Sequence, residues 1–356
     1  MQRLRDNLRA RRLIASFAFC AVLAINLVFT TAILRPGSAW TGGAQWPAYE
    51  ALDENSVDVL VFGASHAFCG VDPAVIWRAR GVPSFVHGGP TQMLQVTEYY
   101  MREALRTQTP KVIALEMTSS SYSMRTFSAV FHVTNLAAMP WTANKAEAIL
   151  KTTPEELRPG MLVSLWYYHA RWPELRPRDL QLLEKSRGAP YLKGFHPRYE
   201  SQEVTAQPYV RPAEDYPVAD AGIAYNREAL DRIAQLCADE GIDLLLFLTP
   251  TGAPQTYSYY LEQSAAPLLA KYDNVRVLDL SVPGAVPGLS YVTDFYDPGH
   301  LNWRGAEKTS AVLADYLADT YELPTRASDP GYDSWYRDAT LHDAHIARGE
   351  QAMADE

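Results

Sequence analysis

The sequence predicts an α/β fold, in which a mainly parallel sheet of five strands lies between helices on both faces. Two observations support this prediction. Five short apolar runs, rich in Val, Ile and Leu, are separated by segments with helical spacing. Most of these runs end at Gly, Pro or a polar residue, as strands that enter turns do. The predicted strands cover residues 57–62, 82–86, 111–117, 242–248 and 275–280.

An uncharged stretch over residues 13–34 precedes the first strand, and its length is that of a membrane-spanning helix. The twelve residues before it carry five Arg and one Asp, so the positive-inside rule places residues 1–12 in the cytoplasm and the rest outside. A signal peptide cleaved after Ala39 is the alternative. We favour an uncleaved anchor because the apolar stretch is long for a signal peptide. Residues 35–56, with Pro, Gly and Ser, are then expected to be a linker.

Charge and cysteine content exclude some classes of function. The chain of 356 residues has a net charge of −9, and since residues 1–34 carry +4, the remainder carries −13. Such an acidic domain is a poor nucleic-acid binder. Cys20 lies in the apolar stretch, while Cys69 and Cys237 are either a disulfide or, as we favour, two buried thiols. No Cys/His spacing indicates zinc, so no metal is expected.

The main domain is expected over residues 57–323 and contains one long interruption. Residues 118–222 have no strong strand signal and many aromatic residues and prolines. An insertion of this length is typical of a cap or substrate-binding element, and we expect it to be helical or looped and to overlie the site. Helices are then predicted over the ranges 226–240, 255–271 and 303–316. A charged tail or surface helix is predicted over 324–356.

Ser65 is the candidate nucleophile. It follows the first predicted strand and the turn residue Gly63, and ligands of open α/β sheets bind at the carboxyl ends of strands. A nucleophilic serine needs a base and a group that orients the base. Asp297 and His300, three residues apart in a Pro-Gly loop before the last sheet-covering helix, would fill these roles. Asp294 is a rival orienting carboxylate, but its spacing from the histidine does not match.

The segments Gly63-Ala64-Ser65 and Asp297-x-x-His300 resemble those of the SGNH/GDSL hydrolase superfamily. The chain is most similar to membrane-anchored, extracytoplasmic SGNH-like proteins of cell-envelope acylation, such as the D-alanine-transfer proteins of lipoteichoic acid assembly and the alginate O-acetylation proteins. The resemblance covers roughly residues 57–316, with a gap in the middle. It implies a flavodoxin-like, three-layer α/β/α domain. Ala64 departs from the acidic residue of the family, and no glycine-x-asparagine block follows the third strand.

The resemblance also implies an oxyanion hole made partly of backbone N–H groups. The N–H of Ser65 is one donor, and Gly89, after the second strand, stands where the family uses a glycine, although Gly88 is the alternative. Gln92 is a candidate side-chain donor, and Asn135 is a candidate for the role of the missing asparagine.

Three further polar residues lie near the predicted site. Glu116 ends the third strand and would either orient a substrate hydroxyl or cap a helix. His66 and His87 are close in sequence to the site, but packing or hydrogen bonding is the usual role of such neighbouring histidines.

The function expected from these residues and the resemblance is that of a membrane-anchored serine esterase or O-acyltransferase. It would form an acyl-serine without a cofactor. Its substrates would be the ester-linked acyl groups, acetyl groups in particular, of a cell-envelope polysaccharide or teichoic-acid-like polymer. The alternative is a non-catalytic accessory protein that partners a membrane-bound O-acyltransferase. A nucleotide-binding Rossmann domain is excluded because the sequence lacks a phosphate-binding loop after its first strand. The G-x-S-x-G elbow is also absent there, since Ala67 takes its last position.

Overall fold

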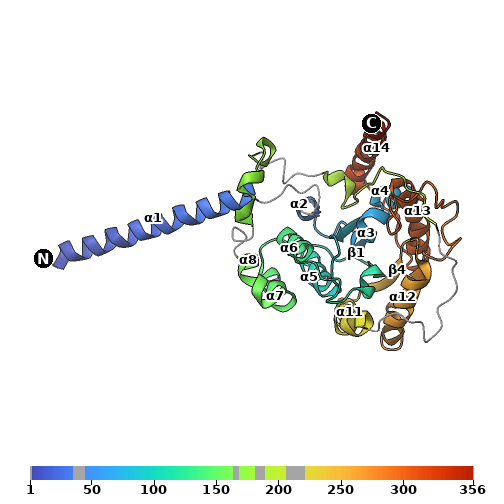
Figure 1. Cartoon of the computed structure of the whole chain (residues 1–356), viewed down its shortest axis with the longest axis horizontal. Helices are drawn as coiled ribbons and strands as arrows, with labels where there is room; N and C mark the ends of the chain where they lie inside the picture. Colours follow the sequence, from blue (N-terminus) through green and yellow to red (C-terminus); the bar gives the residue numbers. More distant parts are fainter. Residues whose placement is uncertain (1, 35–44, 163–167, 181–188, 206–220, 356) are drawn as a thin grey trace.

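The protein is an α/β domain with a long amino-terminal helix (Figure 1). The computed structural model describes residues 2–34, 45–162, 168–180, 189–205 and 221–355. All five predicted apolar runs form strands, and these pair in parallel in the order β2-β1-β3-β4-β5. The strands are β1 (Val59–Gly63), β2 (Ser84–Gly88), β3 (Val112–Glu116), β4 (Asp243–Leu248) and β5 (Val275–Asp279).

Strand β1 lies in the interior of the sheet, with Val59 paired to Ser84 of β2 on one side and to Val112 of β3 on the other. The chain therefore adds β2 on one side of β1 and the remaining strands on the opposite side. In open parallel sheets, such a change of direction leaves a crevice at the carboxyl ends of the two strands concerned. Residues that follow β1 and β3 consequently face a common crevice.

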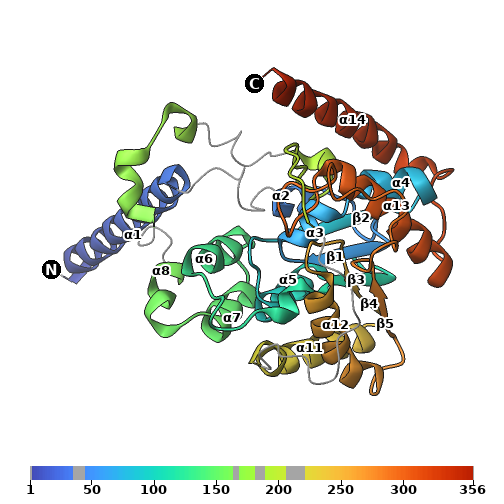
Figure 2. The same ribbon diagram turned by 45° about the vertical axis from the view of Figure 1, so that its right-hand side comes forward.

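Helices cover both faces of the sheet, which gives three layers (Figure 2). One face packs against α5 (Leu94–Ala104), α11 (Ala221–Asp239) and α12 (Pro254–Leu269). The other packs against α4 (Pro73–Arg80) and α13 (Trp303–Thr320). Strands β1, β2 and β3 are buried along their whole length and β4 along nearly all of it, which explains why these strands are mainly apolar instead of alternating with polar residues. The edge strand β5 is only partly covered, and its Arg276 is exposed.

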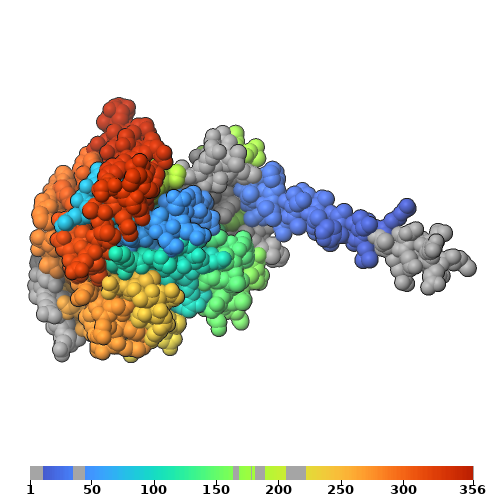
Figure 3. Space-filling model, turned by 180° about the vertical axis from the view of Figure 1, so that it is seen from behind, coloured from blue at the N-terminus to red at the C-terminus, as the bar shows by residue number. Residues whose placement is uncertain are grey.

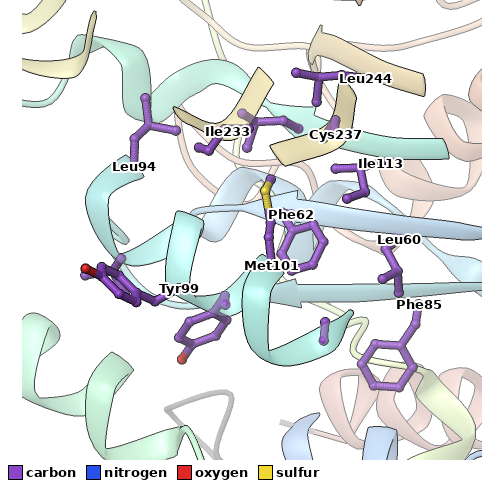
Figure 4. Close-up of a cluster of buried hydrophobic side chains, with 14 of the residues drawn as sticks. Leu60, Phe62, Phe85, Leu94, Tyr99, Met101, Ile113, Ile233, Cys237 and Leu244 are labelled. Carbon is purple, nitrogen blue, oxygen red and sulfur yellow. The ribbon is translucent and has the colours of Figure 1, made fainter. Parts of the chain in front are cut away.

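Alternate residues of β1 belong to different halves of the core. Leu60 and Phe62 point into the cluster under α5 and α11, where Met101 and Ile233 also lie (Figure 4). Val59 and Val61 point into the second cluster, toward α4 and α13. This separation is the period of two expected for a strand.

The segment expected to be a linker is partly inside the domain. Residues Gln45–Glu50 form helix α2, and its Trp46 and Tyr49 are each only 2% exposed. Both rings pack on His87 of β2, at centroid distances of 4.5 and 4.4 Å. The domain therefore includes α2, because these two aromatic side chains pack against His87 of the edge strand β2.

Of the two alternatives predicted for the carboxyl-terminal segment, a tail or a surface helix, the structure has the helix, α14 (Asp333–Ala354). It buries Trp335, Ala339, His342 and Ile346, which recur every three or four residues along one side. The His342 imidazole lies 2.8 Å from the carboxylate of Asp72, the residue that caps α4.

The described parts of the insertion contain helices and no strand, in agreement with the sequence. They are η2 (Met117–Ser121), α6 (Ala129–Ala138), α7 (Ala143–Thr152), η3 (Glu155–Leu157), α8 (Arg158–Leu162), η4 (His169–Glu174), η5 (Pro177–Leu180) and η6 (Pro190–Leu192). Residues 163–167, 181–188 and 206–220 of the predicted insertion lie outside the described residues.

Helix α1 (Gln2–Leu34) extends away from the domain (Figure 3). Its part from Arg11 to Leu34 is long and apolar enough to cross a membrane, and it is the one helix in the described ranges with both properties. Cys69 and Cys237 are both buried and carry free thiols, so the disulfide alternative is not present.

Candidate active site

Ser65 occupies the first position of a short helix, α3 (Ser65–Gly70), immediately after β1. Gly63 makes this tight connection possible. A Cβ atom at Gly63 would lie 2.9 Å from the Cβ atoms of both Ala67 and Glu116, so any larger residue would push α3 or β3 away. The half-buried hydroxyl of Ser65 is consequently held at the carboxyl end of the central strands.

The loop between β5 and α13 carries the other two predicted residues. Asp297 Oδ1 accepts hydrogen bonds from the backbone N–H groups of Gly299, at 2.7 Å, and His300, at 2.9 Å. His300 Nδ1 lies 2.9 Å from Oδ1 and 3.0 Å from Oδ2 of the same carboxylate. Burial opposes ionisation of Asp297, but the hydrogen bonds and charge from His300 and the backbone N–H groups outweigh it. They hold the pKa of this carboxyl well below its usual range.

Folding brings these residues to Ser65. The distance from Ser65 Oγ to His300 Nε2 is 2.6 Å, although the two residues are 235 positions apart in the chain. The tautomer with a proton on Nδ1 satisfies both contacts, since Nδ1–H donates to Asp297 and Nε2 is free to accept from the serine. This is the arrangement of a nucleophile, a base and an orienting acid.

Two aromatic rings flank the His300 imidazole. The His66 ring lies 4.3 Å from it at an interplanar angle of 31°, and the Tyr296 ring lies 5.3 Å from it at 27°. His66 is buried, and burial, with a smaller contribution from neighbouring His300, lowers its pKa to about 3. His66 is therefore neutral at physiological pH and contacts the His300 imidazole through its ring face.

The candidate oxyanion corner lies beside the turn that carries Ser65. Gly88 pairs with Gly63, and its N–H already donates to Gln45 at 3.1 Å, which favours Gly89 as the backbone donor of the two glycines. A Cβ atom at Gly89 would lie 2.1 Å from Asn135 Oδ1 and 3.2 Å from Gln92 Oε1. The structure thus places the two candidate amide side chains around Gly89.

The amide groups of both side chains make internal hydrogen bonds. Gln92 Nε2 donates to Thr97 Oγ1 at 2.9 Å, and Asn135 Nδ2 donates to the Pro90 carbonyl at 3.1 Å. Both side chains are buried, and their oxygens have no protein partner among the described residues. Their position therefore holds the turn around Gly89 in shape.

Glu116 follows β3 at the same edge and is fully buried. Its carboxylate accepts from the Thr118 hydroxyl at 2.7 Å and the Thr118 N–H at 3.2 Å, and it also receives the N–H of Thr249 after β4. Of the two predicted roles, this geometry is that of a helix cap, since Glu116 caps η2. Burial raises the pKa of Glu116 to about 7, against the effect of these hydrogen bonds.

The other predicted candidates have contacts away from the serine. Asp294 is fully buried, and its carboxylate lies 2.6 Å from Lys308 Nζ and 2.8 Å from the Ser290 N–H, so it holds the loop to α13. His87 is enclosed by the aromatic side chains of α2 and β2, and burial lowers its pKa to about 3.

A strap over residues 195–204, within the insertion predicted over 118–222, lies against the loop that carries Asp297 and His300. The sequence predicted that the insertion overlies the site but did not identify the residues that make the contact. The Arg198 guanidinium lies over the Tyr296 ring at 4.9 Å, and the Arg198 carbonyl accepts from the Trp303 N–H at 2.9 Å. The Gly252 N–H, after β4, donates to the Pro298 carbonyl at 2.9 Å in the same loop. Tyr296 could have been noticed in the sequence because it precedes Asp297, whereas nothing in the sequence pairs Arg198 with this loop.

Within the described ranges, no group of three or more His, Cys, Asp or Glu side chains is arranged to hold a metal ion. A scan against protein-family models and a search of curated proteins found no match to the chain.

Proposed function

We propose that the protein is a serine esterase or O-acyltransferase with Ser65 as nucleophile, His300 as base and Asp297 as the orienting acid. The observation that carries this proposal is the 2.6 Å contact between Ser65 Oγ and His300 Nε2, with His300 Nδ1 bound to Asp297. A hydroxyl at this distance from an oriented imidazole is placed to be activated as a nucleophile.

In the first half of the reaction, Ser65 Oγ attacks the carbonyl carbon of an ester while its proton moves to His300 Nε2. The ionised Asp297 stabilises the imidazolium that results. The N–H groups of Ser65 and Gly89 are the proposed donors to the negative oxygen of the tetrahedral intermediate. When the bond to the leaving oxygen breaks, His300 returns the proton to that oxygen and an acyl-serine remains.

In the second half, a hydroxyl compound attacks the acyl-serine. His300 removes its proton, and the same proton then returns to Ser65 Oγ as the bond between the acyl group and the serine breaks. Water as the attacking group gives an esterase, and a sugar or polyol hydroxyl gives a transferase. The chemistry needs no cofactor, since the chain supplies the base, the acid and the oxyanion donors.

We assign the domain to the SGNH type. The strand order 2-1-3-4-5 is that of flavodoxin-like sheets, and the serine and the Asp-His pair follow the first and last strands. The uncharged part of α1, residues 13–34, is preceded by five arginines and one aspartate, which supports a single-pass anchor with a cytoplasmic amino terminus. The proposed substrates are therefore acyl esters, acetyl in particular, of a cell-envelope polysaccharide or teichoic-acid-like polymer.

The second candidate is an accessory protein that binds such a polymer or a membrane-bound O-acyltransferase. One observation favours it: Gln92 Nε2 and Asn135 Nδ2 each use one N–H within the protein, which leaves each amide group a single N–H for an oxyanion.

Turnover of an aryl acetate by the full-length protein in detergent separates the two candidates. An enzyme hydrolyses the ester, and Ser65→Ala reduces the rate to that of the buffer. Ser128→Ala is the matched control, because it removes a hydroxyl that caps α6 outside the site. Equal background rates for wild type and Ser65→Ala would favour the accessory protein.

A further inference from the structure

The outer end of α1 differs from the rest of that helix. The large apolar side chains between Leu13 and Phe29 are 39–76% exposed, whereas Leu34, the last residue of the helix, has no exposed area. The segments η4 (His169–Glu174) and η5 (Pro177–Leu180) lie across this end of the helix (Figures 1 and 2). We call residues His169–Leu180 the collar.

Arg171 connects the collar to α1. Its guanidinium donates to the carbonyl of Leu34, one of the carbonyl groups that have no partner within the helix. The same guanidinium lies 3.7 Å from both Glu174 and the buried Asp179, and Asp179 also accepts from the Arg176 N–H at 2.9 Å. A cation at a helix carboxyl terminus is favourable, so these contacts hold the collar at the height where the apolar part of α1 ends.

The collar also exposes large apolar side chains beside basic ones. Trp172 is 58% exposed and Leu180 is 66% exposed. The collar has three Arg against one Glu and one Asp, while the chain after residue 34 carries a net charge of −13. Tryptophan, leucine and arginine together are typical of segments that lie in the interface of a bilayer.

We propose that the collar is a membrane-contact surface, with Trp172 and Leu180 at the boundary between lipid headgroups and acyl chains and its exposed arginine facing lipid phosphates. The proposal rests on the membrane anchor in the proposed function. It gives the domain a second attachment besides the span, which sets its distance from the bilayer and its orientation. A substrate that reaches Ser65 would then be one presented at a fixed height above the membrane.

Environment-sensitive labelling of the full chain in lipid nanodiscs, one copy in each, tests this surface. In a Cys20→Ser background the two remaining cysteines are buried, so a fluorophore attaches to the introduced thiol of Trp172→Cys or Leu180→Cys. We expect both labels to show blue-shifted emission. We also expect lipids with a spin label near the headgroup to quench most of their fluorescence. The matched control is Leu269→Cys, 49% exposed at the end of α12, on the side of the domain away from α1. This label should be neither shifted nor quenched.

A label on the native Cys20, which is exposed within α1, distinguishes failure of the collar from failure of the anchor. Suppose that deep spin-labelled lipids quench the label at Cys20, but the labels at 172 and 180 are neither shifted nor quenched. That result would overturn the collar proposal and leave the anchor intact. Absence of quenching at Cys20 would overturn both. Should the cysteine variants misfold, quenching by brominated lipids, compared between wild type and Trp172→Phe, measures the same contact. Equal quenching of the two proteins would contradict the proposal.

Discussion

The carboxylate of Asp297 fixes the His300 imidazole in two ways. It accepts the N–H groups of Gly299 and His300 and thereby sets the shape of the loop, and it accepts Nδ1–H of the His300 ring and thereby sets the tautomer. Because the pKa of Asp297 is held below its usual range, the carboxylate stays ionised throughout the pH range in which an imidazole titrates.

Asp297→Asn is expected to lower kcat for an aryl acetate by roughly 10³-fold or more, because an amide favours the wrong tautomer of the base. Steady-state kinetics measures this loss. Asp294→Asn is the matched control: it should reduce thermal stability, since Lys308 loses its buried partner, but leave kcat of the folded protein near the wild-type value. Equal kcat losses in both variants would show that Asp297 acts only by holding the loop.

His66 contacts the base through its ring face, so its shape should matter more than its nitrogen atoms. His66→Ala is expected to lower kcat by about 10²-fold through misplacement of His300, whereas His66→Phe should stay close to wild type. KM should change little in either variant. If His66→Phe loses as much as His66→Ala, the nitrogen atoms take part and the packing explanation is wrong.

Glu116 predicts a pH-dependent stability. Its pKa is about 7 in the folded protein, above the value of an exposed glutamate, so the folded state binds the proton more tightly than the unfolded state. This contribution to stability is complete below the unfolded pKa and is lost as the pH rises through about 7. Chemical denaturation between pH 4 and 8 should show wild type losing up to about 3 kcal/mol relative to Glu116→Gln over this window. Parallel curves for the two proteins would contradict the buried, titrating carboxyl.

At the scale of elements, the strands were the most predictable part of the chain. Four of the five apolar runs are buried on both faces, and such burial leaves an apolar pattern that needs no knowledge of the partner strand. The fifth run, β5, is partly exposed at the edge of the sheet but keeps Val275, Val277 and Leu278 as its apolar signal. The helices that cover the sheet were also predicted, although α11 and α13 each extend several residues further than expected.

Helix α2 was missed because its composition gives no period. The segment before it contains Pro, Gly and Ser, and the helix itself has six residues, of which Trp46 and Tyr49 are buried against a strand far along the chain. Only the folded domain shows that these two rings close the aromatic enclosure around His87.

Trp46→Ala should therefore lower the free energy of unfolding by about 3 kcal/mol or more, since it removes a large buried side chain from the core. Trp141→Ala is the control, because Trp141 is 57% exposed and its ring lies under the Lys145 ammonium group, which predicts a loss below about 1 kcal/mol. Urea denaturation of both variants gives the comparison. A small loss for Trp46→Ala would mean that α2 is not part of the folded domain.

At the scale of the whole molecule, the candidate site joins the two ends of the α/β domain. Ser65 and His300 were predicted to meet because each follows a strand of the same parallel sheet, and such positions gather at one edge. The flanking contacts could not be predicted in this way. Arg198 reaches Tyr296 through a strap without regular secondary structure, and the return path of such a strap leaves no period in the sequence.

The same limit applies to the packing of the terminal segments. The attachment of the collar to α1 depends on Arg171, and the packing of α14 depends on isolated side chains such as Trp335 and His342. In both cases a few specific side chains attach the segment to the rest of the protein. The sequence pattern of each segment indicates at most that a helix forms, and it does not indicate where that helix packs.

The central claim is that His300 activates Ser65. Labelling by a fluorophosphonate, followed by peptide mass spectrometry, tests it most directly, because the reagent reacts with a serine that has an oriented base. We predict rapid modification of wild-type protein at Ser65, slow or undetectable modification of His300→Ala, and none at that position in Ser65→Ala. Modification of Ser65 at equal rates in wild type and His300→Ala, or no modification of Ser65 in the wild type, would contradict the catalytic assignment.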